Sequence, residues 1–274
     1  MLTPEELDRI CIVLVRARNP NNIGAAARAM HDFGLRHLRV VNDYPVPFES
    51  ARSAVDANDV LAGAVVYTTL AEAVADCTLV VGTTAVGERD LQHPLRVLAE
   101  AAAQVREELR RSPVASGRVA LLFGSEKTGL SNEELSHCNW LLTIPMQEHE
   151  GVRHASMNLG QAVAVCLYEL VRDEPASSSD ERLLQKEQSD SAAVPAEEAS
   201  AQAPDESATA ADLERLTTLL AETLEKSGYL RRHPAHCDAV NLRRLLRRMV
   251  ADAGDAAIWT GIFRQLLWKL RRFS

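Results

Sequence analysis

The sequence predicts an α/β domain with a mostly parallel sheet, joined by a linker to a small all-α module. Two observations support this fold class. Short apolar runs alternate with helix-like segments through the first 172 residues, and helical spacing of leucines returns only after residue 212. The chain has 274 residues, of which 46% are apolar and 25% charged. That length suits one large domain with an appendage, and the composition excludes a wholly disordered chain.

Six apolar runs of three to six residues are expected as strands. They are rich in Val, Ile and Leu, as strands buried on both faces are. The segments between them place apolar residues at helical spacing, which predicts helices. The expected strands are 10–15, 38–41, 65–67, 79–81, 119–123 and 140–144, and the expected helices are 25–33, 95–110 and 159–171.

Charge divides the chain into three parts. The net charge is −8, from 30 basic and 38 acidic residues, which excludes a uniformly basic nucleic-acid binder. Residues 173–212 hold eleven acidic and two basic side chains, whereas residues 213–274 hold twelve basic and six acidic ones. We therefore expect an α/β domain at 1–173, an acidic, disordered linker at 174–211 and a basic helical module at 212–274.

The basic module contains an arginine-rich helix. Apolar residues at helical spacing predict helices within 213–224, 242–250 and 258–270. In the second of these, four arginines lie opposite the apolar stripe and form either a solvated surface or a phosphate-binding stripe. They are Arg243, Arg244, Arg247 and Arg248.

The sequence predicts no membrane-spanning segment, no disulfide framework and no metal site. No apolar run approaches the ~18–20 residues that span a bilayer, and the acidic first ten residues do not resemble a signal peptide. The five cysteines form no C-x-x-C pair, so we expect buried free thiols in a cytoplasmic protein. His149 and His154 lack a third ligand at suitable spacing, so no metal site is expected.

The first candidate motif is NPNNIGAAARAMHDFGL, residues 19–35, which follows the first expected strand. Its Asn and Pro residues favour a loop, after which Gly24 and three alanines are expected to open a helix with accessible amides. Arg28 is expected one turn into this helix, and Gly34 ends it as the C′ residue. A plain strand–loop–helix with a surface arginine explains the same pattern.

The second motif, VALLFGSEKTGL at 119–130, runs from a strand into Gly124 and Gly129. Glycines after a strand let the backbone approach a ligand closely. The spacing matches neither the dinucleotide fingerprint nor a P-loop, which argues against a dehydrogenase. Glu126 is either a functional carboxylate or a helix-capping acid.

The third motif begins TIPMQEHEGVRHASMNLGQ at residue 143. A strand is expected to end at Ile144, and Ser156 is a suitable N-cap for the apolar helix that follows. Capping by Ser156 does not explain Asn158, because Asn is a mediocre helix former.

Taken in this order, the three motifs resemble those of the SPOUT (SpoU/TrmH-type) RNA 2′-O-ribose methyltransferases. The resemblance covers about residues 8–172, and the C-terminal part is similar to the extension of members that methylate nucleotide 32 of the tRNA anticodon loop. The matching residues are Asn22-x-Gly24-x-x-x-Arg28, Phe33-Gly34, Phe123-Gly124-x-Glu126-x-x-Gly129-Leu130, Ile144-Pro145-Met146 and Ser156-Met157-Asn158-Leu159.

The resemblance implies a fold, a cofactor and partners. The fold would be a parallel-sheet SPOUT fold with a C-terminal deep trefoil knot, and S-adenosylmethionine would be the methyl donor, bound inside the knot. The enzyme would be a cytoplasmic homodimer that completes its active site across the subunit interface. Its partner would be tRNA, with no membrane and no metal.

The resemblance also implies the site residues. Arg28 would act on the ribose 2′-OH, either as a base helped by a phosphate or by stabilising the developing alkoxide; a guanidinium with a pKa above about 12 is a poor base alone. Asn22, Glu126, Ser156 and Asn158 would orient Arg28 and shape the pocket. Main-chain contacts to the donor would come from Thr83, Thr84, Ala85, Gly124, Ile144, Ala155, Ser156 and Met157, and RNA contacts from Arg243, Arg244, Arg247 and Arg248.

Two other functions stay open: methylation of ribosomal RNA, and RNA binding without chemistry. A basic module on a flexible tether favours tRNA over ribosomal RNA, since it suits gripping a folded tRNA away from the active site. The presence of Arg28, Glu126, Ser156 and Asn158 argues against lost activity.

Overall fold

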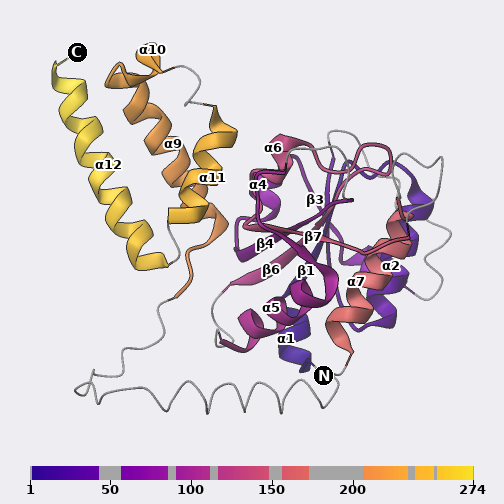
Figure 1. Ribbon diagram of the computed structural model, residues 1–274. Helices are drawn as coiled ribbons and strands as arrows, with labels where there is room; N and C mark the ends of the chain where they lie inside the picture. Colours follow the sequence, from indigo (N-terminus) through magenta and orange to yellow (C-terminus); the bar gives the residue numbers. More distant parts are fainter. Residues whose placement is uncertain are drawn as a thin grey trace, which may run out of the picture.

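The sheet domain is built on seven parallel strands in the order β3-β2-β1-β6-β4-β7-β5 (Figure 1). The computed structural model describes residues 2–42, 57–85, 91–111, 117–147, 156–172, 206–233, 238–249 and 252–273. The predicted parallel α/β class is therefore confirmed. The strands are β1 (Ile10–Val15), β2 (His37–Val41), β3 (Val65–Tyr67), β4 (Cys77–Thr83), β5 (Leu95–Val97), β6 (Arg118–Phe123) and β7 (Trp140–Thr143).

The edge strand β5 is the main departure from the predicted elements. The expected helix at 95–110 is wrong over its first three residues, which pair with β7, and helix α5 (Leu98–Arg111) follows directly. Three residues are too few to show a strand period, so their apolar side chains merged with the helical pattern. β7 ends one residue before Ile144, and β4 extends beyond the expected strand 79–81 at both ends, as far as Thr83.

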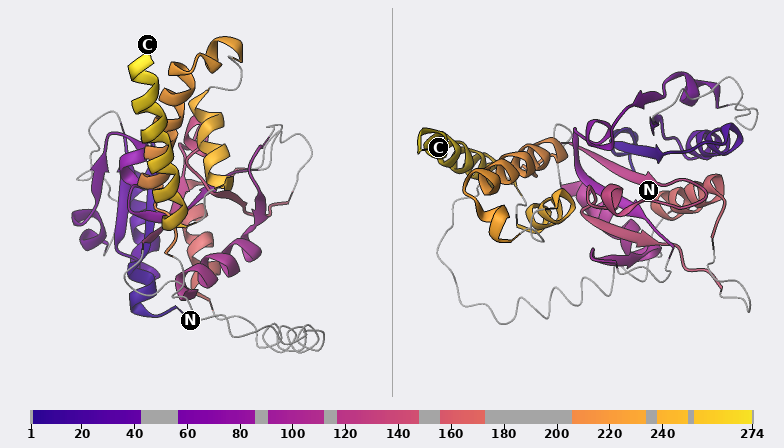
Figure 2. Two further views of the ribbon diagram at one scale, coloured as in Figure 1. Left: turned by 90° about the vertical axis from the view of Figure 1, so that its left-hand side faces the viewer. Right: turned by 90° about the horizontal axis from the view of Figure 1, so that it is seen from above.

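Helices cover both faces of the sheet (Figures 1 and 2). On one face α2 (Pro20–Asp32), α5 and α7 (Leu159–Val171) pack over a core that includes Ile12, Leu121 and Leu142. On the other face α4 (Leu70–Ala73) and α6 (Asn132–Leu135) cover a core that includes Val13 and Leu122. Successive strand residues point to opposite faces, so each central strand serves both cores.

In the sheet domain, four short helices were not predicted, because each has only one turn or slightly more. Capping boxes hold three of them: α1 (Pro4–Asp8) begins after Thr3, α4 after Thr69 and α6 after Ser131. The fourth is α3 (Asn58–Ala62), which follows Ala57 without a side-chain cap.

The C-terminal module is all-α, as predicted. It consists of α9 (Ala210–Lys226), α10 (Tyr229–Arg232), α11 (Ala239–Met249) and α12 (Ala253–Phe273). α9 packs against both α11 and α12 around Leu213, Leu216, Leu246 and Phe263. The start of α9 reaches the sheet domain, where Ala210 joins the second core.

The predicted linker ends earlier than expected. Most of it, residues 174–205, lies outside the described residues. Its last six residues belong to the module: Ala208 and Ala210 are buried, and Thr209 caps α9 in a capping box with Asp212. The Thr-x-x-Asp spacing could have predicted the start of α9 at this point, but the alanine-rich composition was interpreted as linker.

Candidate active site

Neighbouring strands β1, β6, β4 and β7 end at one edge of the sheet. Loops at the carboxyl ends of parallel strands are where open α/β sheets bind ligands. The end of β4 is tied to both neighbours, because Thr83 Oγ1 donates to Leu122 O at 2.8 Å and Thr84 N donates to Leu142 O at 2.9 Å. The three sequence motifs therefore meet along this edge.

Three of the predicted residues form one hydrogen-bonded chain at this edge. Asn22 Nδ2 donates to Glu126 Oε1 at 2.9 Å, and Asn158 Nδ2 donates to Asn22 Oδ1 at 3.0 Å. They come from α2, from the loop after β6 and from the residue before α7. Two amides and one carboxylate, all accessible to solvent, can orient a hydroxyl group of a bound molecule.

Two helix starts differ from the expectation. α2 begins at Pro20 after the N-cap Asn19, so Gly24 lies one turn inside the helix and does not open it with bare amides. Pro is compatible with the first helical position, which the reading of Asn-Pro as a loop overlooked. Asn158, not Ser156, is the N-cap of α7 and accepts from Gly160 N at 3.0 Å, which explains an Asn there.

Close packing of α2 on α7 brings Asn22 to Asn158. A Cβ added at Gly160 would lie 2.5 Å from Ala25 Cβ, so only glycine lets the two helices approach this closely. α7 therefore starts beside the helix that follows β1, although β7 lies three positions from β1 in the sheet.

The loop that carries Glu126 is a tight turn held by an arginine. A Cβ at Gly124 would lie 2.2 Å from Gly129 C, and Gly129 N donates to Ser125 O at 2.8 Å. Arg16 Nε and Nη2 bind the two carboxylate oxygens of Glu134 at 2.6 and 2.9 Å, and Nη2 also donates to Gly129 O at 3.1 Å. Arg16 thus joins the end of β1 to this turn.

Arg16 and Glu134 were missed by the sequence analysis. Arg16 has a φ of +54°, which non-glycine residues adopt infrequently and mostly at turns or functional sites. Burial disfavours the charged form of Glu134, but hydrogen bonds from Arg16 and Ser131 outweigh it and hold the pKa of Glu134 below its usual value. The Ser131-x-x-Glu134 capping box was the signal that could have located this carboxylate.

Arg28 and Ser156 do not join the hydrogen-bonded chain. Both side chains are exposed, and within the described part of the chain Arg28 makes no hydrogen bond or ion pair. Arg28 follows Asn22 by six residues, so at about 100° per residue the two project from different faces of α2. Within one polypeptide, the side chain of Arg28 therefore does not reach Asn22 and Glu126.

The residues expected to contact the donor lie along the same edge, apart from Ala155, which is outside the described residues. Thr84 and Ala85 follow β4, Gly124 follows β6 and Ile144 follows β7, while Met157 is half-buried before α7. They offer main-chain groups and neutral side chains. That set suits an uncharged aromatic ring between apolar walls.

The four arginines of α11 divide into two groups. Arg243 binds Glu214 at 2.8–3.1 Å and Glu133 at 3.1 Å, and Arg247 Nε donates to His137 O at 3.0 Å. These two arginines hold the module against the sheet domain. The four arginines of α11 therefore do not form a single stripe that faces solvent. The other two are Arg248, which is exposed, and Arg244, which donates to Asn241.

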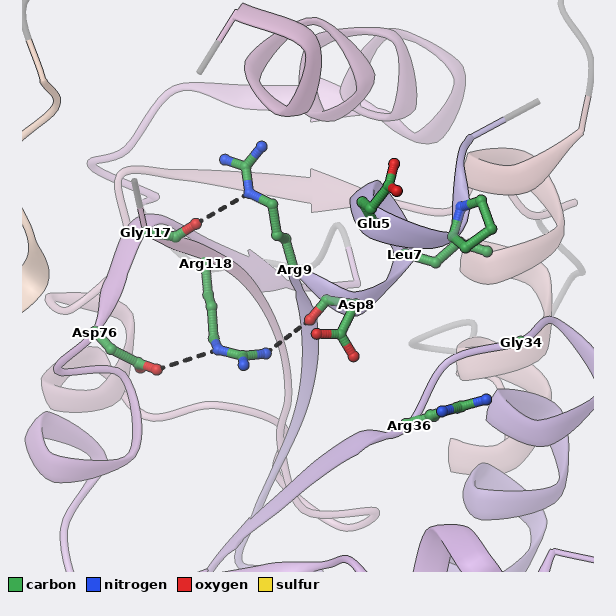
Figure 3. A pocket seen from close by; sticks show the side chains of 10 residues that line it. Glu5, Leu7, Asp8, Arg9, Gly34, Arg36, Asp76, Gly117 and Arg118 are labelled. Carbon is green, nitrogen blue, oxygen red and sulfur yellow. Dashed lines mark hydrogen bonds and ion pairs between the residues drawn. The ribbon is translucent and has the colours of Figure 1, made fainter. Parts of the chain in front are cut away.

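A cavity of about 630 Å³ lies at the opposite, amino-terminal edge of the sheet (Figure 3). It is lined by three acidic and three arginine side chains, and both Arg118 and Arg9 have partners there: Arg118 Nη1 donates to Asp8 O at 2.7 Å, Arg118 Nε lies 3.4 Å from Asp76, and Arg9 Nε donates to Gly117 O at 3.2 Å. It contains none of the motif residues, so it is not the candidate site.

The described residues contain no cluster of three or more His, Cys, Asp or Glu side chains suited to a metal ion. In the same ranges no helix combines the length and apolarity that crossing a membrane requires. The four described cysteines are buried and free, as expected, and burial raises the pKa of Cys138 and Cys166 to about 12. The expectations for Cys237, His149 and His154 concern residues outside the described ranges.

Comparisons with known proteins agree with this geometry. The SpoU rRNA methylase family matches residues 9–168. The tRNA (cytidine/uridine/adenosine-2′-O-)-methyltransferase TrmJ of Pseudomonas aeruginosa is 36% identical over 94% of each chain. The tRNA (cytidine/uridine-2′-O-)-methyltransferase TrmJ of Yersinia enterocolitica is 33% identical and covers 95% of this chain and 92% of its own.

A solved structure matches over nearly the whole length. The crystal structure of TrmJ from Z. mobilis ZM4 is 29% identical, covers 93% of this chain and 98% of its own, and superposes with a TM-score of 0.70. The match includes the C-terminal module as well as the sheet domain. On the family match and these relatives, the chain belongs to the SpoU methylase family.

Proposed function

We infer that this chain transfers a methyl group from S-adenosylmethionine to the ribose 2′-OH of tRNA, at nucleotide 32 of the anticodon loop. The hydrogen-bonded chain of Asn22, Glu126 and Asn158 at the carboxyl edge is the observation that carries this proposal. The family description names ribosomal RNA, but relatives named as tRNA methyltransferases cover 94–95% of this chain, its module included. That coverage favours tRNA.

The bound donor would supply a methyl group already activated by its sulfonium. Main-chain groups of Thr84, Ala85, Gly124 and Ile144 would hold its adenine; their position at adjacent strand ends and their lack of charge support this role. Thr83, Met157 and Ala155 complete the proposed donor contacts.

The substrate hydroxyl would be oriented by the amides of Asn22 and Asn158 and by the carboxylate of Glu126, with Ser156 beside them. Arg28 would bind the target phosphate and stabilise the negative charge that develops on the 2′-oxygen. An exposed guanidinium suits this electrostatic role better than that of a base, since it stays protonated.

A homodimer and a C-terminal trefoil knot belong to the same proposal. Arg28 projects away from Asn22 within one chain, which supports an active site completed by a second copy. The return of the chain from β7 to a helix beside α2 supports a crossing of the kind that a knot requires. Sedimentation of the protein alone tests the dimer.

The function is tested by mass spectrometry of tRNA nucleosides after incubation with S-adenosylmethionine. We expect a 2′-O-methyl mark at nucleotide 32 with the wild type. The Arg28→Ala variant should lose methyl transfer by at least a hundredfold while calorimetry still detects donor binding. Arg36→Ala, which removes an exposed arginine at the opposite edge, is the matched control and should stay active. Loss of donor binding in Arg28→Ala would assign Arg28 a structural role instead.

A further inference from the structure

The end of the module farthest from the sheet domain gathers three helix ends. α10 and the last turns of α9 and α12 lie together there in both Figure 1 and Figure 2. Arg271 Nη2 lies 2.7 Å from Glu222 Oε1, which joins α12 to α9 at this end. α9 has 17 residues and touches the sheet domain at its start, so this end stands about 25 Å away from that contact.

Exposed basic side chains occur on two of the helix ends gathered here, those of α10 and α12. Within the described residues, Arg231 and Arg232 of α10 make no hydrogen bond or ion pair. Lys269 and Arg272 lie in the last turns of α12 and are also exposed. Helix dipoles explain a basic residue in a final turn, because the carboxyl end of a helix is partly negative. They do not explain the aromatic side chains found beside these cations.

Two aromatic rings are exposed among the cations. Tyr229 is 39% exposed and Trp268 is 50% exposed. The guanidinium of Arg272 lies 4.2 Å from the centre of the Trp268 ring, and the Tyr229 ring lies 4.7 Å from that of His233. Rings held in place beside arginines form the platforms on which proteins stack unpaired bases. We call Tyr229, Arg231, Arg232, Trp268, Lys269 and Arg272 the distal surface.

The distal surface contrasts with the arginines of α11. Arg243 is bound to Glu133 and Glu214, and Arg247 to His137, so phosphates reach neither side chain while the module stays docked. The cations of the distal surface carry no such contact with the sheet domain. Among the described residues, Arg231, Arg232, Lys269 and Arg272 therefore leave the far end of the module open to a polyanion, and Arg248 of α11 is exposed as well.

We propose that the distal surface binds unpaired nucleotides of the RNA substrate. Arg231, Arg232 and Lys269 contact phosphates, and the rings of Trp268 and Tyr229 stack on bases. The identity of the RNA as tRNA rests on the proposed function. This surface belongs to α10 and α12, whereas Asn22, Glu126 and Asn158 belong to the sheet domain, so the two sites contact different parts of the RNA.

The arginines are tested with the Arg231→Gln/Arg232→Gln double variant in the full-length protein. We expect tRNA affinity to fall at least tenfold at low salt, and the slope of log K against log salt to decrease by about one to two. Arg36→Gln/Arg110→Gln removes two exposed arginines from the sheet domain and is the charge-matched control. Equal losses in both variants, or no loss in either, would overturn the proposal.

The aromatic contact is tested separately with Trp268. Trp268→Leu should lower affinity about tenfold without changing the salt slope, because stacking releases no counterions, and Trp268→Phe should recover part of it. Unchanged affinity in Trp268→Leu would rule out stacking on this ring. Methyl transfer at saturating tRNA should stay near the wild-type rate in these variants, with only KM raised. If the proposed function were wrong, the wild type itself would give no methylation of tRNA. If only the role of the distal surface were wrong, the wild type would methylate tRNA and the variants would bind it with wild-type affinity.

Discussion

Glu126 can serve a bound ribose only if its loop stays fixed against α2. The fixing contact is made by Arg16, which reaches both Glu134 and the carbonyl of Gly129 from the end of β1. The left-handed backbone of Arg16 aims its side chain at this loop, at a cost that the surrounding contacts offset. We therefore propose that Arg16 positions the loop of Glu126 through its contacts with Glu134 and Gly129.

Replacing Arg16 by Met should cost about 2 kcal/mol of unfolding free energy, because Glu134, whose side chain is only 10% exposed, loses its partner. Methyl transfer should fall through kcat, since the loop with Glu126 loosens. Arg16→Met/Glu134→Gln should recover part of the stability. Urea denaturation and steady-state kinetics measure both effects, and an additive double mutant would show that the two side chains act independently.

The resemblance to SPOUT motifs singled out Asn22, Glu126 and Asn158, and the structure brings these three side chains together. The motifs were not sufficient to predict the contacts among them. Glu134, the partner of Arg16, is 118 residues away in the sequence. The two side chains meet because Arg16 has a positive φ, which no local sequence pattern predicts. Asn158 is the N-cap of α7, but the sequence analysis assigned that role to Ser156, since both residue types cap helices well.

At the scale of elements, the turn after β6 is the most constrained part of the site. Gly124 lies so close to Gly129 and Leu130 that no side chain fits. The spacing of apolar residues predicted neither β5 nor the start of α2. A three-residue strand and an Asn-Pro helix start carry almost no periodic signal.

Gly124→Ala should shift this turn, because the new Cβ would meet Gly129 C at 2.2 Å and Leu130 N at 2.3 Å. We expect methyl transfer to fall at least tenfold and stability to fall by about 1–3 kcal/mol, the usual cost of overpacking. Gly261→Ala is the control: it lies within α12 with nothing near its Cβ, and should stabilise the protein by about 0.5–1 kcal/mol. Equal activity in both variants would contradict the constraint on the turn.

At the scale of the whole molecule, the module is held to the sheet domain by buried charges. The sequence predicted two folded parts and a linker, but not how the parts meet, because their contact joins Arg243 and Arg247 to residues over a hundred positions earlier. The contact also places His93 and His137 near α11. Burial, then the positive charges of α11, lower the pKa of both histidines, and that of His93 falls to about 4.

This arrangement predicts a loss of stability in mild acid. Between pH 6.5 and 4 the unfolded chain protonates His93 while the folded protein does not, so unfolding takes up a proton and stability decreases as the pH falls. Because the His93 ring is only about half-buried, we expect a loss of about 1 kcal/mol between pH 7.5 and pH 5, above the range where carboxylates contribute. Urea midpoints at the two pH values measure it. His93→Gln should reduce the difference, and an unchanged difference would mean that the charged interface does not govern this pH response.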